Sequence, residues 1–244
     1  RSSAASDVYK RQEYKDETAR PGYYSNVLTK YGIKCEVAAT MRSSIERYTF
    51  PGGKSNLLFN LGNGLTNEIG ASLRRVSDTE FEGTRLLGTF CYNPQAVFPM
   101  YFVVRVNKKP SAFGMWKKQP DLHNAQAQWD TYQGKYKLYP GYGRDMAGND
   151  IGYYMTYDLA KGEQVEVQVG VSFVSIEGAR ANLNAEQQGF NFDKTVADTR
   201  AEWANTLNRI SVEGGTDDQR RVLYTALYHS QIHPTLSLIH ISEP

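Results

Sequence analysis

Cysteine is scarce in this sequence, because Cys35 and Cys91 are the two that its 244 residues contain. Neither belongs to a C-x-x-C pair, so the spacing does not support a redox or zinc motif. Two explanations stay open: one disulfide, or two buried thiols that pack as small hydrophobic side chains. The sequence does not decide whether Cys35 and Cys91 are joined.

A strong charge of one sign is also missing. The 28 Lys and Arg residues nearly balance the 26 Asp and Glu residues, for a net charge of +2. A chain without a basic field is not expected to bind nucleic acid. No stretch approaches the roughly 20 apolar residues that a membrane span needs, and the first twelve residues lack the apolar segment of a signal peptide. The hydrophobic content of 40% is ordinary for a globular chain with a core.

Common catalytic motifs are absent as well. The sequence has neither the G-x-S-x-G turn of acyl-transfer enzymes nor the phosphate-binding loop of nucleotide hydrolases. His229 and His233 stand one helical turn apart, but Ser230 occupies the position where the H-E-x-x-H zinc motif needs Glu. We therefore expect the two histidines to lie at a helix end, facing solvent or the helix dipole, rather than to bind a metal.

The carboxylates show no paired signature, because the two groups that glycoside hydrolysis needs meet only in space. Glu36 and Glu46 alternate along strand-like runs and are predicted to lie on solvated faces. Asp217 and Asp218 open a predicted helix, where their charge complements the helix dipole. No catalytic residue is assigned from the sequence.

Three oxygen-bearing side chains, Asp145, Asn149 and Asp150, fall in the segment DMAGND. Calcium prefers such ligands, but the segment lacks the other ligands of an EF-hand loop. We favour an ordinary polar turn over a calcium site at these residues.

Tyrosine and glycine are abundant, with 17 and 21 residues. Several short runs alternate with a period of two and are bounded by turn residues, which is typical of strands with one buried face. These runs are 33–40, 44–50, 55–62, 71–77, 81–88, 100–107, 151–159 and 163–175, with turns at 51–54 and 160–163. The series predicts a mainly β chain that folds as a β-sandwich.

Residues 107–150 interrupt this rhythm with Lys, Pro, Gly and Asn residues among several aromatic side chains. Such an insert is either a functional loop or a poorly ordered one. Exposed Trp and Tyr rings stack on the apolar faces of sugars, while their polar tips bond hydroxyl groups. Trp116 and Trp129 are thus candidates for a carbohydrate-binding cleft, although covering the edge of the sandwich would explain them equally well.

At Ser175 the apolar period changes from two to about 3.6, which predicts helices. Ser175 is the expected N-cap of a short first helix, and Asp193 that of a longer second helix. Thr216 and Gln219 form a capping box at the start of a third helix, which Pro234 would end. The apolar stripes are Val196, Trp203, Leu207 and Ile210 on the second helix and Val222, Leu223, Ala226 and Leu227 on the third.

Three segments together resemble the α-mannosidases of glycoside hydrolase family 92. They are RPGYYSNVLTKYGIKCEVAATMRSSIERYTFP at 20–51, GEQVEVQVGVSFVSIEGARANLNAE at 162–186 and FDKTVADTRAEWANTLNRISVEGGTDDQRRVLYTALYH at 192–229. Their joint occurrence in the family's order makes the resemblance specific, although no single segment would suffice. The middle of the chain, about 85–150, matches the family less well.

The resemblance implies a β-sandwich (supersandwich) domain, a helical linker and the first helix of a truncated (α/α)6 catalytic barrel. It also implies that the parent enzyme removes terminal α-linked mannose from glycans by inverting hydrolysis, with calcium as cofactor, in the periplasm or outside the cell. The family's catalytic and calcium-binding residues lie in the barrel beyond this fragment. We therefore carry over no site residue and expect the fragment itself to be inactive.

On this basis the sandwich takes residues 13–190, the helical linker 191–215 and the first barrel helix 216–236. The end segments 1–12 and 237–244 resemble translated sequencing adapters and are left out of the fold. Two other interpretations stay open. One is a non-catalytic carbohydrate-binding or interaction sandwich, and the other is a different glycosidase or phosphorylase that joins a sandwich to an α/α barrel.

Overall fold

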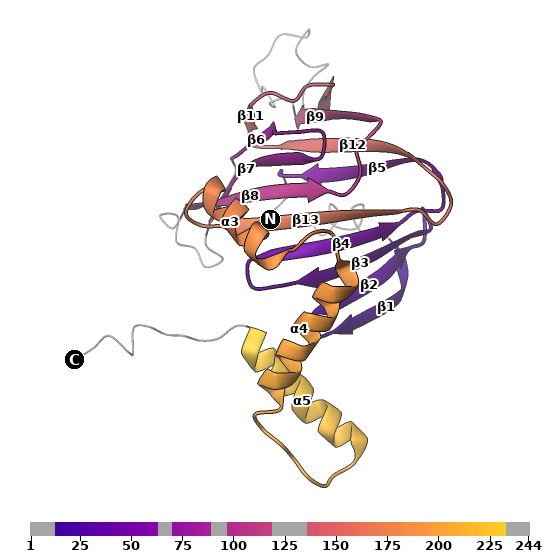
Figure 1. Ribbon diagram of the computed structural model, residues 1–244, viewed down its shortest axis with the longest axis vertical. Helices are drawn as coiled ribbons and strands as arrows, with labels where there is room; N and C mark the ends of the chain where they lie inside the picture. The colour runs from indigo at the N-terminus through magenta and orange to yellow at the C-terminus, as the bar shows by residue number, and fades with distance from the viewer. Residues whose placement is uncertain (1–12, 63–69, 89–96, 119–135, 233–244) are drawn as a thin grey trace, which may run out of the picture.

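The computed structural model describes residues 13–62, 70–88, 97–118 and 136–232. These residues form two packed β-sheets, with helices on one face that continue past the end of the sheets (Figure 1). The predicted fold class, a β-sandwich followed by the start of a helical region, is confirmed.

The larger sheet has nine antiparallel strands in the order β1-β2-β3-β4-β13-β8-β7-β6-β11. They are β1 (Tyr14–Arg20), β2 (Tyr23–Leu28), β3 (Ile33–Ala39), β4 (Ser43–Thr49), β13 (Gln164–Ser172), β8 (Phe98–Val106), β7 (Glu80–Leu87), β6 (Ala71–Arg75) and β11 (Met146–Gly148). The smaller sheet has four antiparallel strands, β10 (Tyr136–Pro140), β9 (Ala112–Lys118), β12 (Ile151–Leu159) and β5 (Gly53–Asn60).

Strands β9, β10 and β11 lie in the segment where the strand rhythm was predicted to break. The alternation is blurred in β9 because apolar side chains point to both of its faces. Phe113 and Met115 pack into the core, whereas Trp116 lies on the opposite face. A strand that is apolar on both faces loses the period-two pattern from which the others were predicted.

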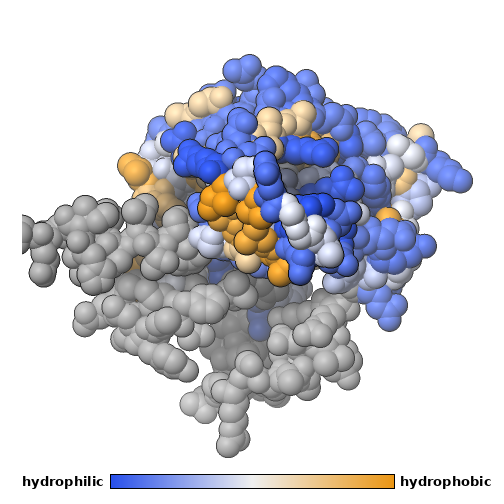
Figure 2. Space-filling view, turned by 90° about the horizontal axis from the view of Figure 1, so that it is seen from below, coloured by the Kyte–Doolittle hydropathy of each residue, from blue (hydrophilic) through white to orange (hydrophobic). Residues whose placement is uncertain are grey.

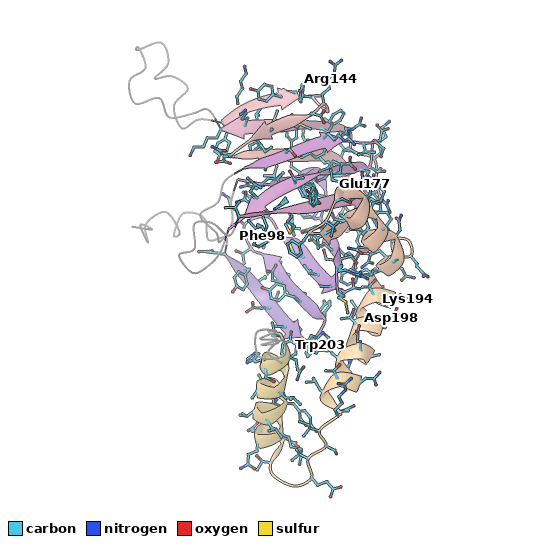
Figure 3. The ribbon with its side chains drawn as sticks, turned by 90° about the vertical axis from the view of Figure 1, so that its left-hand side faces the viewer. Phe98, Arg144, Glu177, Lys194, Asp198 and Trp203 are labelled. Carbon is cyan, nitrogen blue, oxygen red and sulfur yellow. The ribbon has the colours of Figure 1, made fainter. Side chains whose placement is uncertain are left out.

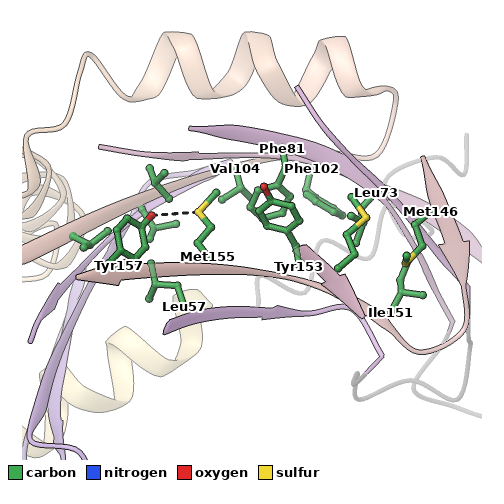
Figure 4. Close-up of a cluster of buried hydrophobic side chains, with 14 of the residues drawn as sticks. Leu57, Leu73, Phe81, Phe102, Val104, Met146, Ile151, Tyr153, Met155 and Tyr157 are labelled. Atoms are coloured by element: carbon green, nitrogen blue, oxygen red, sulfur yellow. Dashed lines mark hydrogen bonds between the residues drawn. The ribbon is translucent and has the colours of Figure 1, made fainter. Parts of the chain in front are cut away.

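The main core fills the space between the two sheets (Figure 4). Phe81 of β7 stacks on Tyr153 of β12 with ring centroids 4.6 Å apart, and Phe59 of β5 meets Phe81 edge-on at 4.8 Å. The Tyr157 hydroxyl lies 3.3 Å from the Met155 sulfur, as the dashed line shows. Each aromatic pair stabilises the fold by about 0.5–1.5 kcal/mol in addition to the free energy gained by burying its surface. These contacts therefore help to hold one sheet against the other.

Helix α3 (Ile176–Glu186) covers the outer face of the larger sheet across β13 and β8. Its N-cap is Ser175, whose side chain accepts a hydrogen bond of 3.0 Å from the Gly178 N–H, as predicted. Leu183 is fully buried, and a Cβ on Gly170 of β13 would meet the Leu183 Cβ at 2.6 Å. The glycine therefore permits the close approach of helix and strand.

Helix α4 (Phe192–Leu207) begins earlier than predicted. Its N-cap is Asn191, which accepts a hydrogen bond of 3.2 Å from the Lys194 N–H, so the assignment of this role to Asp193 is wrong. Asp193 lies within the first turn and pairs with Arg47 of β4 at 3.0 Å. Asp193 thus lies inside the helix, where its charge complements the helix dipole, rather than at the cap.

The face of α4 that packs on the sheet overlaps the predicted stripe only at Val196, which packs against the cluster of Ala38, Ile45 and Phe192. Phe192, Thr195 and Thr199 are the buried residues of this helix. A Cβ on Gly22 would come within 2.5 Å of the Thr199 side chain, so short threonine side chains suit this approach better than leucine would. Trp203 and Leu207 face a groove beside β1–β3 instead, which Val196 also lines, and Ile210 lies beyond the helix, 51% exposed.

Helix α5 (Asp217–Ile232) opens with the predicted capping box. The Gln219 side chain accepts from the Thr216 N–H at 2.9 Å, and the Thr216 hydroxyl accepts from the Gln219 N–H at 3.2 Å. Asp217 and Asp218 occupy its first turn, as expected. Pro234, predicted to end the helix, lies outside the described residues.

Helix α5 buries none of its side chains. It touches α4 through Trp203 and Tyr228, whose ring centroids are 4.8 Å apart, at the end of the molecule where both helices extend past the sheets (Figure 3). Val222 is 69% and Leu223 41% exposed, and apolar side chains gather on this end of the molecule (Figure 2). Among the described helices, none is long and apolar enough to cross a bilayer.

Candidate functional site

Glu36 is the most deeply buried of the carboxylates considered from the sequence, and its predicted solvated position is wrong. Its side chain is 4% exposed and accepts hydrogen bonds from Arg47 Nε at 3.0 Å and the Tyr23 hydroxyl at 3.0 Å, while Lys34 Nζ lies 3.0 Å away. Burial by itself raises the pKa of Glu36, but the hydrogen bonds from Arg47, Lys34 and Tyr23 outweigh it and lower the pKa to about 2. The residue therefore stays ionised and does not supply a proton.

Arg47 links this buried carboxylate to helix α4. Its guanidinium carbon lies 4.2 Å from the centroid of the Phe192 ring, and its Nη1 donates to Asp193 at 3.0 Å. Alternation along β3 places Glu36 correctly on the face opposite Cys35, but α4 covers that face. The packing of α4, which sequence periodicity does not show, is the reason that the prediction for Glu36 failed.

Glu46 is half-buried on the other face of the larger sheet, so its predicted solvated position is also wrong. Burial raises the pKa of Glu46, against the opposing effect of a hydrogen bond donated by the Tyr48 hydroxyl. A raised carboxyl pKa is a feature of catalytic acids. Here burial and Tyr48 account for the shift, and no neighbouring carboxylate contributes to it, so the geometry does not give the acid–base pair of a glycosidase.

Other buried carboxylates fasten helix α3 to the sheet. Glu82, with a side chain 3% exposed, and Glu80 both pair with Arg180 of α3, and Glu80 also accepts from Arg105 Nε at 2.6 Å. Burial raises the pKa of Glu80, and the bonds from Arg105 and Arg180 outweigh it and lower the pKa. These ion pairs are thus structural.

Glu186 fixes the end of α3 to the turn between β3 and β4. It accepts hydrogen bonds from the Thr40 hydroxyl at 2.5 Å, the Arg42 N–H at 2.9 Å and Arg42 Nε at 2.8 Å. The next residue, Gln187, donates to the Ser43 hydroxyl at 3.0 Å. These bonds, like those of Glu36 with Arg47 and of Glu80 and Glu82 with Arg180, hold a helix against the sheet. The paired carboxylates are therefore structural.

The polar segment from Asp145 to Asp150 contains β11 and its connection to β12. Asp150 accepts a hydrogen bond from the Tyr136 hydroxyl at 2.8 Å, and the Asp145 carbonyl accepts one from Tyr142 at 3.0 Å. Within the described ranges, no three His, Cys, Asp or Glu side chains lie close enough together to hold a metal ion. Asp145 and Asp150 thus belong to no such cluster, and the preference for an ordinary polar turn at this segment stays a prediction.

The histidines and cysteines add no catalytic group to the described part of the chain. His229 is exposed near the end of α5, and its predicted neighbour His233 lies outside the described residues. Cys35 has a free, half-buried thiol whose pKa burial raises to about 11. Such a thiol is protonated at neutral pH and a poor nucleophile, and Cys91 lies outside the described residues.

A neutral aromatic groove occupies the outer face of the smaller sheet, with a volume of about 450 Å³. We call it the sheet groove. Its lining residues are Asn56, Leu58, Asn60, Trp116, Tyr136, Leu138 and Tyr154. Of the two tryptophans proposed from the sequence, Trp116 lies in this groove, whereas Trp129 lies outside the described residues.

Two glycines shape the floor of the sheet groove. Gly152 pairs with Trp116 across the β12–β9 ladder, and Gly114 pairs with Tyr154. A Cβ on Gly152 would lie 2.0 Å from the Trp116 ring, and one on Gly114 would lie 2.5 Å from the Tyr154 hydroxyl. Each aromatic ring therefore lies across the glycine opposite it and covers the strand.

Two amides and three exposed side chains border this floor. Asn56 Oδ1 accepts from the Thr156 hydroxyl at 2.8 Å, and Asn60 Oδ1 accepts from the Gly62 N–H at 2.8 Å. Because each amide oxygen is engaged, each NH₂ group is oriented as a donor. The exposed side chains are Leu58, Leu138 and Tyr136, which are 68%, 60% and 51% exposed.

The sheet groove suits a neutral ligand that has an apolar face and polar edges, because its lining has no charged side chain. Apart from Trp116, its residues were not singled out from the sequence. A signal was present in Gly114 and Gly152, since glycine inside a strand often marks the close approach of another group.

A larger groove of about 730 Å³ lies between α4 and the outer face of β1–β3. Val196, Trp203 and Leu207 form its helical side. Charged residues of both signs, Asp16, Arg20, Lys34 and Arg200, line it as well. Trp203 and Leu207 of the predicted apolar stripe therefore line this groove rather than pack on the sheet.

Comparison with protein families gives two matches in sequence order. The model of the glycosyl hydrolase family 92 N-terminal domain matches residues 1–172, and the model of the catalytic domain of the same family matches residues 178–238. A search of curated proteins gave no match.

Solved structures support the fold. The chain is similar to a family GH92 α-mannosidase from Bacteroides thetaiotaomicron, with a TM-score of 0.75 and 24% identity over 92% of this chain and 29% of that one. It is also similar to a GH92 inverting mannosidase from the same bacterium, with a TM-score of 0.73 and 22% identity over 90% of this chain and 27% of that one. A third structure, a GH92 family glycosyl hydrolase, has a TM-score of 0.71 and 26% identity over 89% of this chain and 28% of that one. The chain thus spans less than a third of the length of these proteins.

Proposed function

The chain belongs to glycosyl hydrolase family 92, and from this premise we propose that the protein it represents removes terminal α-linked mannose from glycans. The observation that carries the proposal is the match of both family domains in the family's order. Support for mannose comes from the similar structures, of which one is described as an α-mannosidase, also in complex with mannoimidazole, and another as an inverting mannosidase. We further propose that the enzyme is exported to the periplasm or outside the cell.

We propose inversion as the stereochemical course, as in the mannosidase described as inverting. In that scheme an acid protonates the leaving oxygen while a base activates water on the opposite face of the sugar. We place both carboxylates in the catalytic domain, because the buried carboxylates described above are paired with cations or hydroxyl groups that hold the fold together. The 244-residue chain on its own should therefore not hydrolyse mannosides.

Calcium is proposed as the cofactor of the whole enzyme, where it would help to distort the bound sugar and orient water. The described residues offer no cluster that fits it. No step of the reaction is assigned to calcium in this chain.

The proposal is tested by expressing the full reading frame at this locus beside the 244-residue chain. The full protein is expected to release mannose from an aryl α-mannoside and from α-linked mannobioses, and to lose this activity after calcium chelation. The short chain is expected to release no mannose. Proton NMR of the first product formed gives its anomeric configuration. Release of a different sugar by the full protein would overturn the assignment to mannose, and activity of the short chain would overturn the placement of the carboxylates.

A further inference from the structure

We propose that the sheet groove on β5, β12, β9 and β10 is a binding site for a hexopyranose ring of a neutral oligosaccharide. The preference for a neutral sugar rests on the geometry of the groove. The choice of an α-linked mannoside as the sugar rests on the proposed function. The two parts are separable by experiment.

The floor of the groove is aromatic, with Tyr154 half-buried and Trp116 largely covered, at 9% exposure. One face of a hexopyranose presents C–H groups, which pack against the face of an aromatic ring. The pairing of Gly152 with Trp116 and of Gly114 with Tyr154 lets both aromatic rings lie across the sheet. Had either glycine been alanine, its methyl group would occupy the space that the ring now fills.

Covering a glycine with an aromatic ring also stabilises a sheet, but that role leaves the border of the groove unexplained. Leu58, Leu138 and Tyr136 are more than half exposed around the floor. The Tyr136 hydroxyl donates to Asp150 at 2.8 Å, and this contact fixes the ring at the border. An apolar cluster held in this way at the surface of a chain is typical of a ligand-binding surface.

The polar groups of the border suit sugar hydroxyls. The oxygens of Asn56 and Asn60 are engaged by Thr156 and Gly62, so each amide presents its NH₂ group as a donor to a hydroxyl oxygen. The lining has no charged side chain, whereas the larger groove beside α4 has charges of both signs. This neutrality favours an uncharged sugar over a sulfated or uronic-acid ligand. The volume of about 450 Å³ lies within the usual range for small-molecule sites.

The test uses the purified 244-residue chain in native affinity electrophoresis through gels that contain soluble α-mannan, β-glucan or polygalacturonate. Retardation by α-mannan is expected, and the dissociation constant for an α-mannobiose follows from calorimetry. Tyr136→Ala and Asn60→Ala should each weaken binding by about tenfold or more, because each removes a direct contact with the ring or its hydroxyls. Trp116→Ala is not used for binding, because Trp116 is 9% exposed and its loss would change stability as well as the groove.

Matched controls separate the groove from general effects. Tyr31→Ala removes a tyrosine that is 50% exposed, close to the 51% of Tyr136, on the turn between β2 and β3. Asn205→Ala removes an exposed amide on α4. Both variants should bind α-mannan as the unchanged chain does, and thermal unfolding should show that all four variants are folded.

Each outcome has a definite meaning. Failure of every neutral polysaccharide to retard the folded chain, or stronger retardation by polygalacturonate, would overturn the site and leave the proposed hydrolysis untouched. Equal binding by Tyr136→Ala and Tyr31→Ala would also overturn it. Retardation by β-glucan without α-mannan, if lost in Tyr136→Ala, would support the site and reject mannose as its ligand. A dimer that Tyr136→Ala dissociates would show that a second copy occupies the groove and would overturn the proposal.

Discussion

Arg47 of β4 donates to both carboxylate oxygens of Glu36 on β3, with Nε 3.0 Å from Oε2 and Nη2 3.1 Å from Oε1. The pair lies between the larger sheet and α4, where the guanidinium also lies over the Phe192 ring. A paired charge of this kind is stable only while both partners are present, because removing one leaves the other buried without compensation. The position of α4 on the sheet therefore depends on this contact.

The loss of Arg47 gives the first prediction. Arg47→Ala would leave Glu36 buried and charged, and is expected to lower the free energy of unfolding by about 3–5 kcal/mol. Lys34→Ala is the matched control, since it removes the other cation at Glu36. Because the Lys34 side chain is 49% exposed, its loss should cost less than about 1 kcal/mol. Urea unfolding at neutral pH measures both. Equal losses would contradict the role given to Arg47.

The acid sensitivity of the fold gives a second prediction. The pKa of Glu36 in the folded chain is about 2, below its ordinary value of 4.5. Because its pKa is lower in the folded state, ionised Glu36 stabilises the fold. This contribution is fully present above pH 4.5 and is lost as the pH falls toward 2. Glu36→Gln should therefore show a flatter decline of stability with acid than the unchanged chain. Urea unfolding at a series of acidic pH values tests this, and parallel declines would count against it.

Glu46 should behave in the opposite way. Burial raises the pKa of Glu46 above its ordinary value of 4.5, so its ionisation destabilises the folded state as the pH rises through the folded-state pKa. Glu46→Gln keeps an acceptor for the Tyr48 hydroxyl and removes the charge. The variant is expected to be more stable than the unchanged chain at pH 7 and to lose this advantage below about pH 4.5. A variant that is less stable at pH 7 would show that the carboxylate is ionised without penalty.

The floor of the sheet groove gives a fourth prediction. Gly152→Ala places a methyl group where the Trp116 ring lies, 2.0 Å from the ideal Cβ, and should lower the free energy of unfolding by about 1–3 kcal/mol. In the Trp116→Ala background the same change should cost much less, because the space is then free. Thermal and urea unfolding of the single and double variants form the cycle. Additive losses would mean that ring and glycine do not interact.

Local signals predicted a large part of the fold. The caps at Ser175 and at Thr216–Gln219 were correct because each involves atoms within four positions along the chain. The assignments of burial that failed involve partners far apart in sequence. Asp193 was taken as the cap of α4, whereas Asn191, two positions earlier, caps it through an equally local bond from Lys194. The pairing of Asp193 with Arg47, 146 positions away, is what no local pattern contains.

The sequence by itself determined the strand rhythm, the change to helices at Ser175 and the membership of a glycoside hydrolase family. It did so because alternation, capping and family-specific segments are written in neighbouring residues. The tertiary structure decided which side chains are buried and which surfaces exist. Glu36 is buried because α4 closes over β3 and β4, and the sheet groove exists because strand register brings Gly152 opposite Trp116 and Gly114 opposite Tyr154. Burial and register depend on which surfaces meet, and that is settled only when the sheets and helices pack together.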